Sequence, residues 1–321
     1  MTAVEITVLL PVYGRSKLLK EAWSSLQAQS DPRWRLLLAD DGSDSATASF
    51  IAEGPARDHR TTWIRRAQNL GLFANLNGAM GQQPSPWWLL LCSDDRLLPD
   101  AVARLRQLHT AWPDASLIIS THKSIGPAGE PLPPVSAFHH DRISSKTTLL
   151  QPDQFVPLLL HRGSINGNLS GMAFRGELLE KAGMFRPHWS HAADWEWLIR
   201  AGEHAPVLLN RDPIAEVRTH PSQLSNANRC SGAELREVAA VQRLLLAHPL
   251  LQNEPRRFQW AAHRLQFQLW NLLKQVLGGH WQGIGEGLVE IQRTVGLAPV
   301  LWALLAWLPR RLSSCRAKSG P

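Results

Sequence analysis

The chain has 321 residues, of which 44% are hydrophobic, so it can bury one large core or two modest ones. Its formal net charge of +7 and pI of about 9.8 are compatible with nucleic acid, an anionic membrane surface or phosphorylated substrates. The three cysteines, Cys92, Cys230 and Cys315, are scattered, which excludes a cysteine cluster with metal-binding spacing and favours reduced thiols in the cytosol.

No segment has the pattern of a secretory signal or a membrane span. Residues 1–10 lead straight into a predicted strand, without a basic segment followed by an apolar one. The longest apolar stretch, 295–308, is interrupted by Pro299 and is shorter than the ~20 residues of a membrane span. We therefore expect a cytoplasmic protein.

Predicted strands alternate with predicted helices in the first part of the chain. Bounded apolar runs predict strands, and apolar residues three or four positions apart predict helices. The predicted elements are strand 6–10, helix 18–26, strand 34–39, helix 46–52, strand 61–65, helix 72–80, strand 87–91 and helix 99–109. This alternation implies right-handed βαβ units, so we predict an α/β fold with a mostly parallel sheet.

The later part of the chain is less regular. Its predicted elements are strand 116–120, loop 126–134, strand 170–174, helix 176–182, helix 195–201 and strands 207–210 and 215–218. From Glu234 onward the pattern is helical and rich in leucine. We predict a first domain at 1–228, a helical region at 229–312 and a disordered tail at 313–321.

Two adjacent carboxylates, Asp94 and Asp95, directly follow the apolar run 87–91. The end of this predicted buried strand delivers them to the rim of the sheet, where ligands of open α/β folds bind. Adjacent carboxylates repel each other unless a cation compensates them. We expect a hard divalent cation with oxygen ligands, which usually also binds a phosphate.

Other predicted strands and helices also have polar residues at their ends. Tyr13, after Pro11, can lay its ring against a nucleobase or simply pack after a turn. Asp41, in Asp40-Asp41-Gly42-Ser43, can accept hydrogen bonds from a base or ribose, although Asp-Gly is also an ordinary turn. Asn69 lies near a helix N-terminus that favours phosphate, and it is equally suited to capping that helix.

Taken in order, these segments resemble the family 2 glycosyltransferases, which have the GT-A fold. The resemblance rests on Pro11-Val12-Tyr13, Asp40-Asp41-Gly42-Ser43, Asn69-Leu70-Gly71 and Ser93-Asp94-Asp95, and it covers about the first 220 residues. It implies a Rossmann-like three-layer sandwich and an inverting, hexosyltransferase-type enzyme. Such an enzyme moves a sugar from a nucleotide sugar, here a UDP-sugar, to a glycan or lipid-linked acceptor in surface polysaccharide synthesis.

The resemblance also implies roles for single residues. It places Mn²⁺ or Mg²⁺ at Asp95, where the ion assists departure of the nucleoside diphosphate. Cys92 departs from the family, which often has an Asp there, and sulfur is a poor ligand for these ions. The implied nucleotide-sugar contacts are Pro11, Tyr13, Asp41, Asn69 and, near the ribose, Asp94.

Two later segments complete the resemblance. Asp194 matches the general base that deprotonates the acceptor hydroxyl, although it also suits a helix N-cap. Ala193 replaces a commonly acidic neighbour, and Glu196 is expected to be solvated or paired with Arg200. In the Arg-x-His segment, Arg218 or His220 contacts the diphosphate or metal, and we name His220 as a metal ligand, although a loop histidine without function fits nearly as well. Residues 164–174 resemble the acceptor-side segment.

The C-terminal stretch 299–308 contains Trp302 and Trp307 and precedes Arg310 and Arg311. Apolar and aromatic residues beside basic ones suit an anionic membrane surface, and a core helix gives a similar pattern. Peripheral contact with the inner face of the cytoplasmic membrane is therefore one of two interpretations.

Two functions from other classes stay open at this point. A catalytically silent GT-A module that binds sugars or partners is compatible with Cys92 and Ala193. A basic nucleic-acid-binding protein fits the pI, but the Lys and Arg residues are dispersed and no binding motif occurs. We therefore expect no nucleic-acid partner.

Overall fold

The computed structural model describes residues 5–133, 143–165, 168–224, 228 and 232–316, without the side chains of 309–316. The chain forms two compact units: unit 1 comprises 1–155 and 164–223, and unit 2 comprises 156–163 and 224–321. The predicted domain boundary after residue 228 adjoins residues outside the described part, and it stays a prediction. Helix α12 (Leu297–Arg316) extends into the tail predicted to be disordered, whose last residues, 317–321, also lie outside the described part.

Unit 1 contains a nine-stranded sheet in the order β3-β2-β1-β4-β8-β6-β9-β5, with β7 beside β9. Its strands are β1 (Ile6–Val12), β2 (Trp34–Asp40), β3 (Thr61–Arg65), β4 (Trp87–Leu90), β5 (Arg96–Leu97), β6 (Leu117–Ile125), β7 (Thr148–Leu150), β8 (Met172–Arg175) and β9 (Val207–Arg218). The pairings give β1, β2, β3, β4, β6 and β9 one direction and β5, β7 and β8 the other. The predicted mostly parallel sheet is confirmed.

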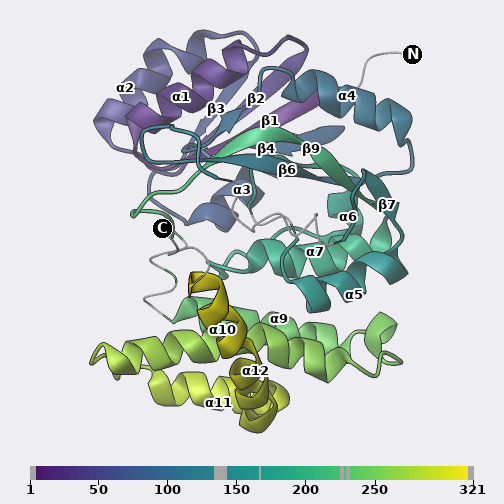
Figure 1. The fold of residues 1–321 in the computed structure, drawn as a ribbon. Helices are drawn as coiled ribbons and strands as arrows, with labels where there is room; N and C mark the ends of the chain where they lie inside the picture. Colours follow the sequence, from purple (N-terminus) through teal and green to yellow (C-terminus); the bar gives the residue numbers. More distant parts are fainter. Residues whose placement is uncertain (1–4, 134–142, 166–167, 225–227, 229–231, 317–321) are drawn as a thin grey trace. The chain divides into compact units, whose positions relative to one another are not determined.

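Helices cover both faces of this sheet (Figure 1). They are α1 (Ser16–Gln27), α2 (Ser45–Glu53), α3 (Leu72–Met80), α4 (Ala101–Ala111), α6 (Leu178–Ala182) and α7 (Ala193–His204), with a short 3₁₀ helix at Pro55–Arg57. Buried residues of α1, α2 and α4 share one core with alternate residues of β1 and β2, such as Val8 and Leu36. On the other face, Trp197 of α7 packs against Phe174 and Phe185. The predicted three-layer α/β sandwich is thus confirmed.

β1 and β9 are among the strands that extend beyond their predicted bounds. β1 continues through Pro11, which pairs in register with Ala39 of β2. Residues of a parallel strand bond alternately to its two neighbours. The Leu9 carbonyl accepts from the Leu91 N–H on the β4 side, so the backbone of Pro11, two residues later, faces the same side. β4 ends before it reaches Pro11, and the missing N–H of Pro11 therefore interrupts no hydrogen bond between strands. β9 is one strand rather than two, because β6 pairs along most of its length, with a shift between Ser120 and His122.

Unit 2 is helical. It contains α9 (Ala233–Ala247), a 3₁₀ helix (Pro249–Leu251), α10 (Arg257–Leu277), α11 (Ile284–Val295), α12 and the last part of α5 (Pro152–Arg162). Gly287 of α11 packs closely on Leu235 and Leu272, since a Cβ there would lie 3.0 Å from both side chains. Among the described helices, none is by itself long and apolar enough to span a membrane; α11 and α12 reach the criterion only as a pair bent by 99°.

Candidate active site

Three parallel strands of unit 1 end at one edge of the sheet. In the register, Val12 of β1 lies beside Asp40 of β2, and Leu9 lies beside Leu90 of β4. The segments that follow these strands therefore share an edge, which is where ligands of open α/β sheets bind. The predicted site residues that this edge brings together are Tyr13, Asp41, Asn69, Asp94 and Asp95.

The turn after β1 leaves Tyr13 58% exposed. The next residues, Gly14 and Arg15, both have left-handed backbones, with φ values of 64° and 62°. A positive φ is uncommon for a non-glycine residue, so this is a constrained turn. The Gly14 N–H donates to Ser43 Oγ over 2.9 Å, which joins the turn to the end of β2. Pro11 is buried inside β1, and its predicted contact with a nucleotide stays a prediction.

Asp41 is buried and organises the neighbouring Asn69 turn. Its two carboxylate oxygens accept from the backbone N–H groups of Leu70 and Gly71, each over 2.9 Å. The Asn69 side chain accepts from the same Gly71 N–H over 2.8 Å. The structure thus joins two predicted nucleotide-binding residues in one turn, where Asp41 holds the backbone in place.

Asp95 is buried beneath the edge and accepts three hydrogen bonds. Its Oδ1 accepts from the Arg218 N–H over 2.8 Å, and its Oδ2 accepts from Ser170 Oγ over 2.5 Å and from Asn168 Nδ2 over 3.1 Å. Burial and the neighbouring Asp94 raise the pKa of Asp95 to about 7, although the three donors oppose the shift. The predicted metal ligand is therefore a buried, hydrogen-bonded carboxyl.

Asp94 lies nearer the surface and contacts two potential cations. Its Oδ2 is 3.0 Å from His220 Nε2 and 3.4 Å from an Arg15 guanidinium nitrogen. The other ring nitrogen of His220, Nδ1, is 3.0 Å from Ser222 Oγ. Arg15 also donates to the Ser222 carbonyl over 2.5 Å. The predicted residues Asp94 and His220 thus come together directly.

Arg218 is fully buried and holds several segments together. Its side chain donates to the carbonyls of Asp94, Gly126 and Pro127 over 2.8, 3.3 and 3.0 Å, and to Glu21 of α1 over 2.5 Å. Every guanidinium nitrogen has a protein partner, so Arg218 is a structural residue rather than a contact for a diphosphate. Of the two predicted alternatives in this segment, the geometry favours His220.

Asp194 lies in the first turn of α7, and its Oδ1 accepts from the Trp195 N–H over 2.8 Å. The electrostatic surroundings of the Cys92 thiol indicate which carboxylates lie near it. Burial raises the pKa of Cys92 well above its usual value, and the charges of Asp95, Asp94 and Asp194 raise it further. The charge of Asp194 thus contributes to the same pKa shift as the acidic pair, with the smallest effect of the three carboxylates.

Glu196, two residues later, does not belong to the site surface. It is buried and accepts from Arg200 at both oxygens, over 2.8 and 2.7 Å, and it pairs with Arg186 over 2.8 Å. Burial raises its pKa, but the hydrogen bonds from Arg200 and Arg186 together outweigh this, so the pKa lies below its ordinary value. The predicted pairing with Arg200 is confirmed, and solvation of Glu196 is wrong.

Comparison with known sequences now decides the family. Residues 7–157 match the sequence model of glycosyl transferase family 2. This match, over just under half of the chain, supports a family 2 glycosyltransferase. The match includes the strand ends that carry Tyr13, Asp41 and the Asp94–Asp95 pair, and it ends before Asp194 and His220.

Curated relatives and solved structures agree with this family. The chain is 29% identical over 200 residues to the uncharacterized protein y4gI of Sinorhizobium fredii, covering 62% of this chain and 20% of that one. It is 27% identical over 104 residues to the GalNAc(5)-diNAcBac-PP-undecaprenol beta-1,3-glucosyltransferase of Campylobacter jejuni, covering 32% and 34%. It thus spans between 14% and 34% of the length of the curated relatives it matches.

Two solved structures share the fold. S. aureus TarS in complex with UDP-GlcNAc superposes with a TM-score of 0.61 at 18% identity, covering 82% of this chain and 72% of that one. The mannosyltransferase PcManGT from Pyrobaculum calidifontis, in complex with GDP-Man and Mn²⁺, gives a TM-score of 0.55 at 15% identity, covering 98% and 88%. Both likenesses concern the fold.

The edge of this family 2 glycosyltransferase has suitable ligands for a divalent cation. Two neighbouring ligands on an octahedral ion, each about 2.1 Å from it, lie about 3.0 Å apart. That is the separation of Asp94 Oδ2 and His220 Nε2, 3.0 Å. Ligand atoms of Cys92, Asp94 and Asp95 also lie within 4.8 Å of one another. Asp94 and His220 are therefore candidate ligands, which in this structure are hydrogen-bonded to each other. Asp95 accepts three hydrogen bonds, which leaves about one of the four lone pairs of its carboxylate for an ion.

Sequence reasoning missed the residues that support the acidic pair. Asn168 and Ser170 lie in the segment predicted to line the acceptor pocket, of which residues 166–167 lie outside the described part. The structure instead shows Asn168 and Ser170 on Asp95, and Ser170 Oγ also accepts from the Cys92 N–H over 2.9 Å. Arg15 was missed as well. Nothing in single positions signals these contacts, because they join segments over 70 residues apart.

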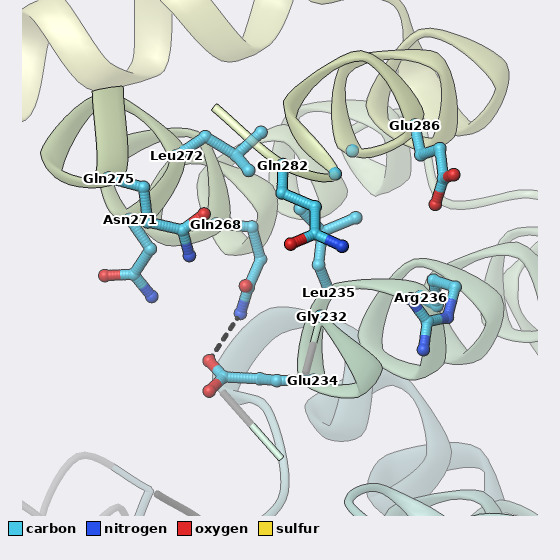
Figure 2. Close-up of a pocket in the computed structure, with 12 residues that line it drawn as sticks. Gly232, Glu234, Leu235, Arg236, Gln268, Asn271, Leu272, Gln275, Gln282 and Glu286 are labelled. Carbon is cyan, nitrogen blue, oxygen red and sulfur yellow. Dashed lines mark hydrogen bonds between the residues drawn. The ribbon is translucent and has the colours of Figure 1, made fainter. Parts of the chain in front are cut away.

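Unit 2 has a polar cavity of its own, of about 410 Å³ (Figure 2). It is lined by the first turns of α9 and α11 and the second half of α10. Gln268 donates to Glu234 over 2.9 Å at one side of the cavity, and Asn271, Gln275 and Gln282 add further amides. No residue predicted as a site residue lines this cavity.

Proposed function

We propose that the chain is an inverting glycosyltransferase that moves a sugar from a UDP-sugar to a hydroxyl group of a glycan or lipid-linked acceptor. The observation that carries the proposal is the pair Asp94–His220, 3.0 Å apart at the carboxyl edge of the sheet. A similar structure contains UDP-GlcNAc, and the name of the Campylobacter relative specifies an undecaprenol-linked acceptor. Surface polysaccharide synthesis is the pathway we propose on the same basis.

In this proposal Asp94 and His220 hold Mn²⁺ or Mg²⁺. A divalent ion there offsets the charge that develops on the departing nucleoside diphosphate. Asp95 fixes the loop that carries Asp94, because its own oxygens already bond Arg218, Ser170 and Asn168. This exchanges the roles that the resemblance implies for Asp94 and Asp95. The similar mannosyltransferase structure that contains Mn²⁺ supports the choice of ion.

Tyr13 and the Asn69 turn complete the donor side. The exposed ring of Tyr13 offers an apolar face to the uracil base. The Asn69 turn, which follows β3, is held by Asp41 at the end of the adjacent strand β2. Both elements have fixed backbones, since Gly14 is bonded to Ser43 and Gly71 to Asp41. Such preorganisation lowers the entropic cost of binding the nucleotide.

Asp194 acts as the general base on the acceptor side. It takes the proton of the acceptor hydroxyl while that oxygen attacks the anomeric carbon and the bond to the diphosphate breaks. The attacking and leaving oxygens lie on opposite sides of this carbon, so one displacement inverts its configuration. The charges of Asp194 and Asp94 both raise the pKa of the Cys92 thiol, which supports placing the base near the donor site.

Calorimetric titration with UDP, with and without Mn²⁺, tests the donor side. We expect Mn²⁺ to tighten UDP binding to the wild type, and Asp94→Asn and His220→Ala each to weaken the Mn²⁺-dependent binding by about tenfold or more. Asp95→Asn should chiefly lower thermal stability. If Asp95→Asn alone removes the Mn²⁺ dependence from a folded protein, Asp94 is the wrong ligand. If the wild type binds UDP in neither condition, the proposed function fails.

A silent sugar-binding module is the second candidate, favoured by Cys92 and by Ala193, which is fully buried where relatives often have an acid. Such a protein would bind UDP-sugars with Mn²⁺ but neither hydrolyse nor transfer them. A wild type that is silent across a panel of UDP-sugars, and that gains hydrolysis in Cys92→Asp, would establish this alternative.

A further inference from the structure

Helix α12 begins with twelve residues, Leu297–Leu308, that include no polar side chain. One face of this segment packs inside unit 2, where Val300, Ala303 and Leu304 are buried. On the same segment, the Trp307 ring lies 5.5 Å from Phe267 and 6.1 Å from Trp270 of α10. The helix is thus anchored to the rest of unit 2 through one side.

The opposite face is equally apolar but exposed. Leu301, Trp302 and Leu305 are 46%, 74% and 57% exposed. At positions i, i+1 and i+4 they lie on one face of the helix. A helix on the surface of a soluble domain normally carries polar residues on its outer side. An exposed apolar face of this kind therefore marks a contact with a partner.

The charge around this face indicates which partner. The sequence continues from Leu308 with Pro309, Arg310 and Arg311, followed by Arg316. On α11, the Arg293 side chain is 70% exposed, although it lies 3.6 Å from the Glu290 carboxylate. An apolar and tryptophan-bearing helix face that is followed in the sequence by arginines matches the chemistry of an anionic bilayer surface, with apolar acyl chains beneath negative headgroups.

We propose that the outer face of α12, formed by Leu301, Trp302 and Leu305, inserts into the headgroup region of an anionic membrane. The helix lies along the surface, because its other face is covered by α10 and only the outer face is open to lipid. The outer face of α12 would thus make the peripheral contact that the sequence predicts with the inner face of the cytoplasmic membrane. The inference does not depend on the proposed transferase activity.

Sedimentation of the full-length chain with vesicles tests the proposal. We expect the wild type to sediment with phosphatidylglycerol vesicles and to stay in solution with phosphatidylcholine vesicles, with retention falling as salt rises. The double variant Trp302→Glu, Leu305→Glu should lose at least tenfold in vesicle affinity. The matched control is Leu244→Glu, since Leu244 is an exposed leucine on α9 of the same unit, and it should bind vesicles like the wild type.

Several outcomes would overturn the proposal. These are equal binding by the double variant and the wild type, equal loss in the control, or no binding of the wild type to either vesicle. Light scattering without lipid tests the alternative that a second copy of the chain binds this face. A wild-type dimer that is absent in the double variant would establish this alternative. If the double variant does not fold, Arg310→Glu with Arg311→Glu replaces it, and unchanged binding of that variant to phosphatidylglycerol would equally refute the proposal. UDP binding should be unchanged in all variants, which separates this test from that of the active site.

Discussion

The two units differ in what they expose. Among the described residues, unit 1 exposes three large hydrophobic side chains, and unit 2, although smaller, exposes twelve. Those of unit 1 are Tyr13, Leu70 and Met184, and two of them adjoin the candidate active site. Unit 1 instead concentrates charged groups at a strand edge and fixes them with hydrogen bonds. The contrast indicates that chemistry belongs to unit 1 and surface contact to unit 2.

The largest expected effect of a substitution, a fall in kcat, is at Asp194, and it would test whether chemistry belongs to unit 1. Asp194→Asn should lower kcat for sugar transfer by about 10³-fold, since a positioned general base contributes about 10²–10⁴-fold. UDP binding with Mn²⁺ should persist, because Asp194 is not among the proposed donor ligands. The measurement is a radiolabelled or chromatographic transfer assay with an accepted donor.

A matched control for this variant is Asp153→Asn, which changes an acid in the first turn of α5. It should leave kcat unchanged. A fall in kcat for Asp194→Asn of less than threefold would assign Asp194 to helix capping alone.

The next effect is on the stability of unit 1. Glu196→Gln should lower the free energy of unfolding by about 3 kcal/mol, because it removes one partner of a buried ion pair and leaves Arg200 and Arg186 uncompensated. Glu203→Gln, on the same helix and largely at the surface, should change it by less than about 0.5 kcal/mol. Chemical denaturation followed by circular dichroism measures both.

The stability difference between the wild type and Glu196→Gln should depend on pH, because Glu196 titrates. Its folded pKa lies below the ordinary value, so its stabilisation is present above the unfolded pKa of about 4.3 and is lost as the pH falls through the folded pKa. The stability difference between wild type and Glu196→Gln should therefore shrink on acidification below about pH 4. A difference that grows on acidification would contradict the sign of this pKa shift.

Two adjacent leucines test the description of α12 in unit 2. Leu304→Ala should destabilise unit 2 by about 2–5 kcal/mol, because Leu304 is buried and its loss leaves a cavity. Leu305→Ala should cost less than about 0.5 kcal/mol in solution, because Leu305 is exposed. Equal costs in thermal denaturation would show that the outer face is covered within the protein.

The smallest effect is expected at Cys92. Cys92→Asp should tighten Mn²⁺ binding by up to about tenfold, because a carboxylate oxygen suits this ion better than sulfur and the thiol lies close to Asp94. Cys92→Ser should have little effect. Calorimetric titration with Mn²⁺ measures both, and identical affinities for all three proteins would place the ion away from Cys92.

The sequence predicted the fold of unit 1 well because its strands are bounded apolar runs that end in turn residues. β3 (61–65) and α3 (72–80) have the predicted bounds. β5 and β7 were missed because two and three residues are too short to show a pattern, and both pair with the distant strand β9. α5 was missed too, and Pro157 inside it argues locally against a helix.

The site was predictable in membership and less so in roles. Strand ends place Asp94 and Asp95 at the edge from local pattern alone. Which of the two faces a ligand depends on Ser170, just before β8, and on Arg218, at the end of β9, both more than 70 residues away. The same holds for Glu196, whose burial follows from Arg186 and Arg200 around it. Neighbouring acids look alike in sequence, and tertiary contacts distinguish them.

The buried guanidinium of Arg218 has a consequence for biosynthesis. It joins α1, the loop after β4 and the turn at Gly126, yet it is contributed by the last strand of the sheet. On the ribosome, Glu21 and the Asp95 carboxyl emerge about 200 and 120 residues before this partner, so both lack it until β9 docks. A chain truncated before residue 218 should therefore keep a loose loop at 92–95, and we expect the candidate active site to become ordered only when synthesis of unit 1 is complete.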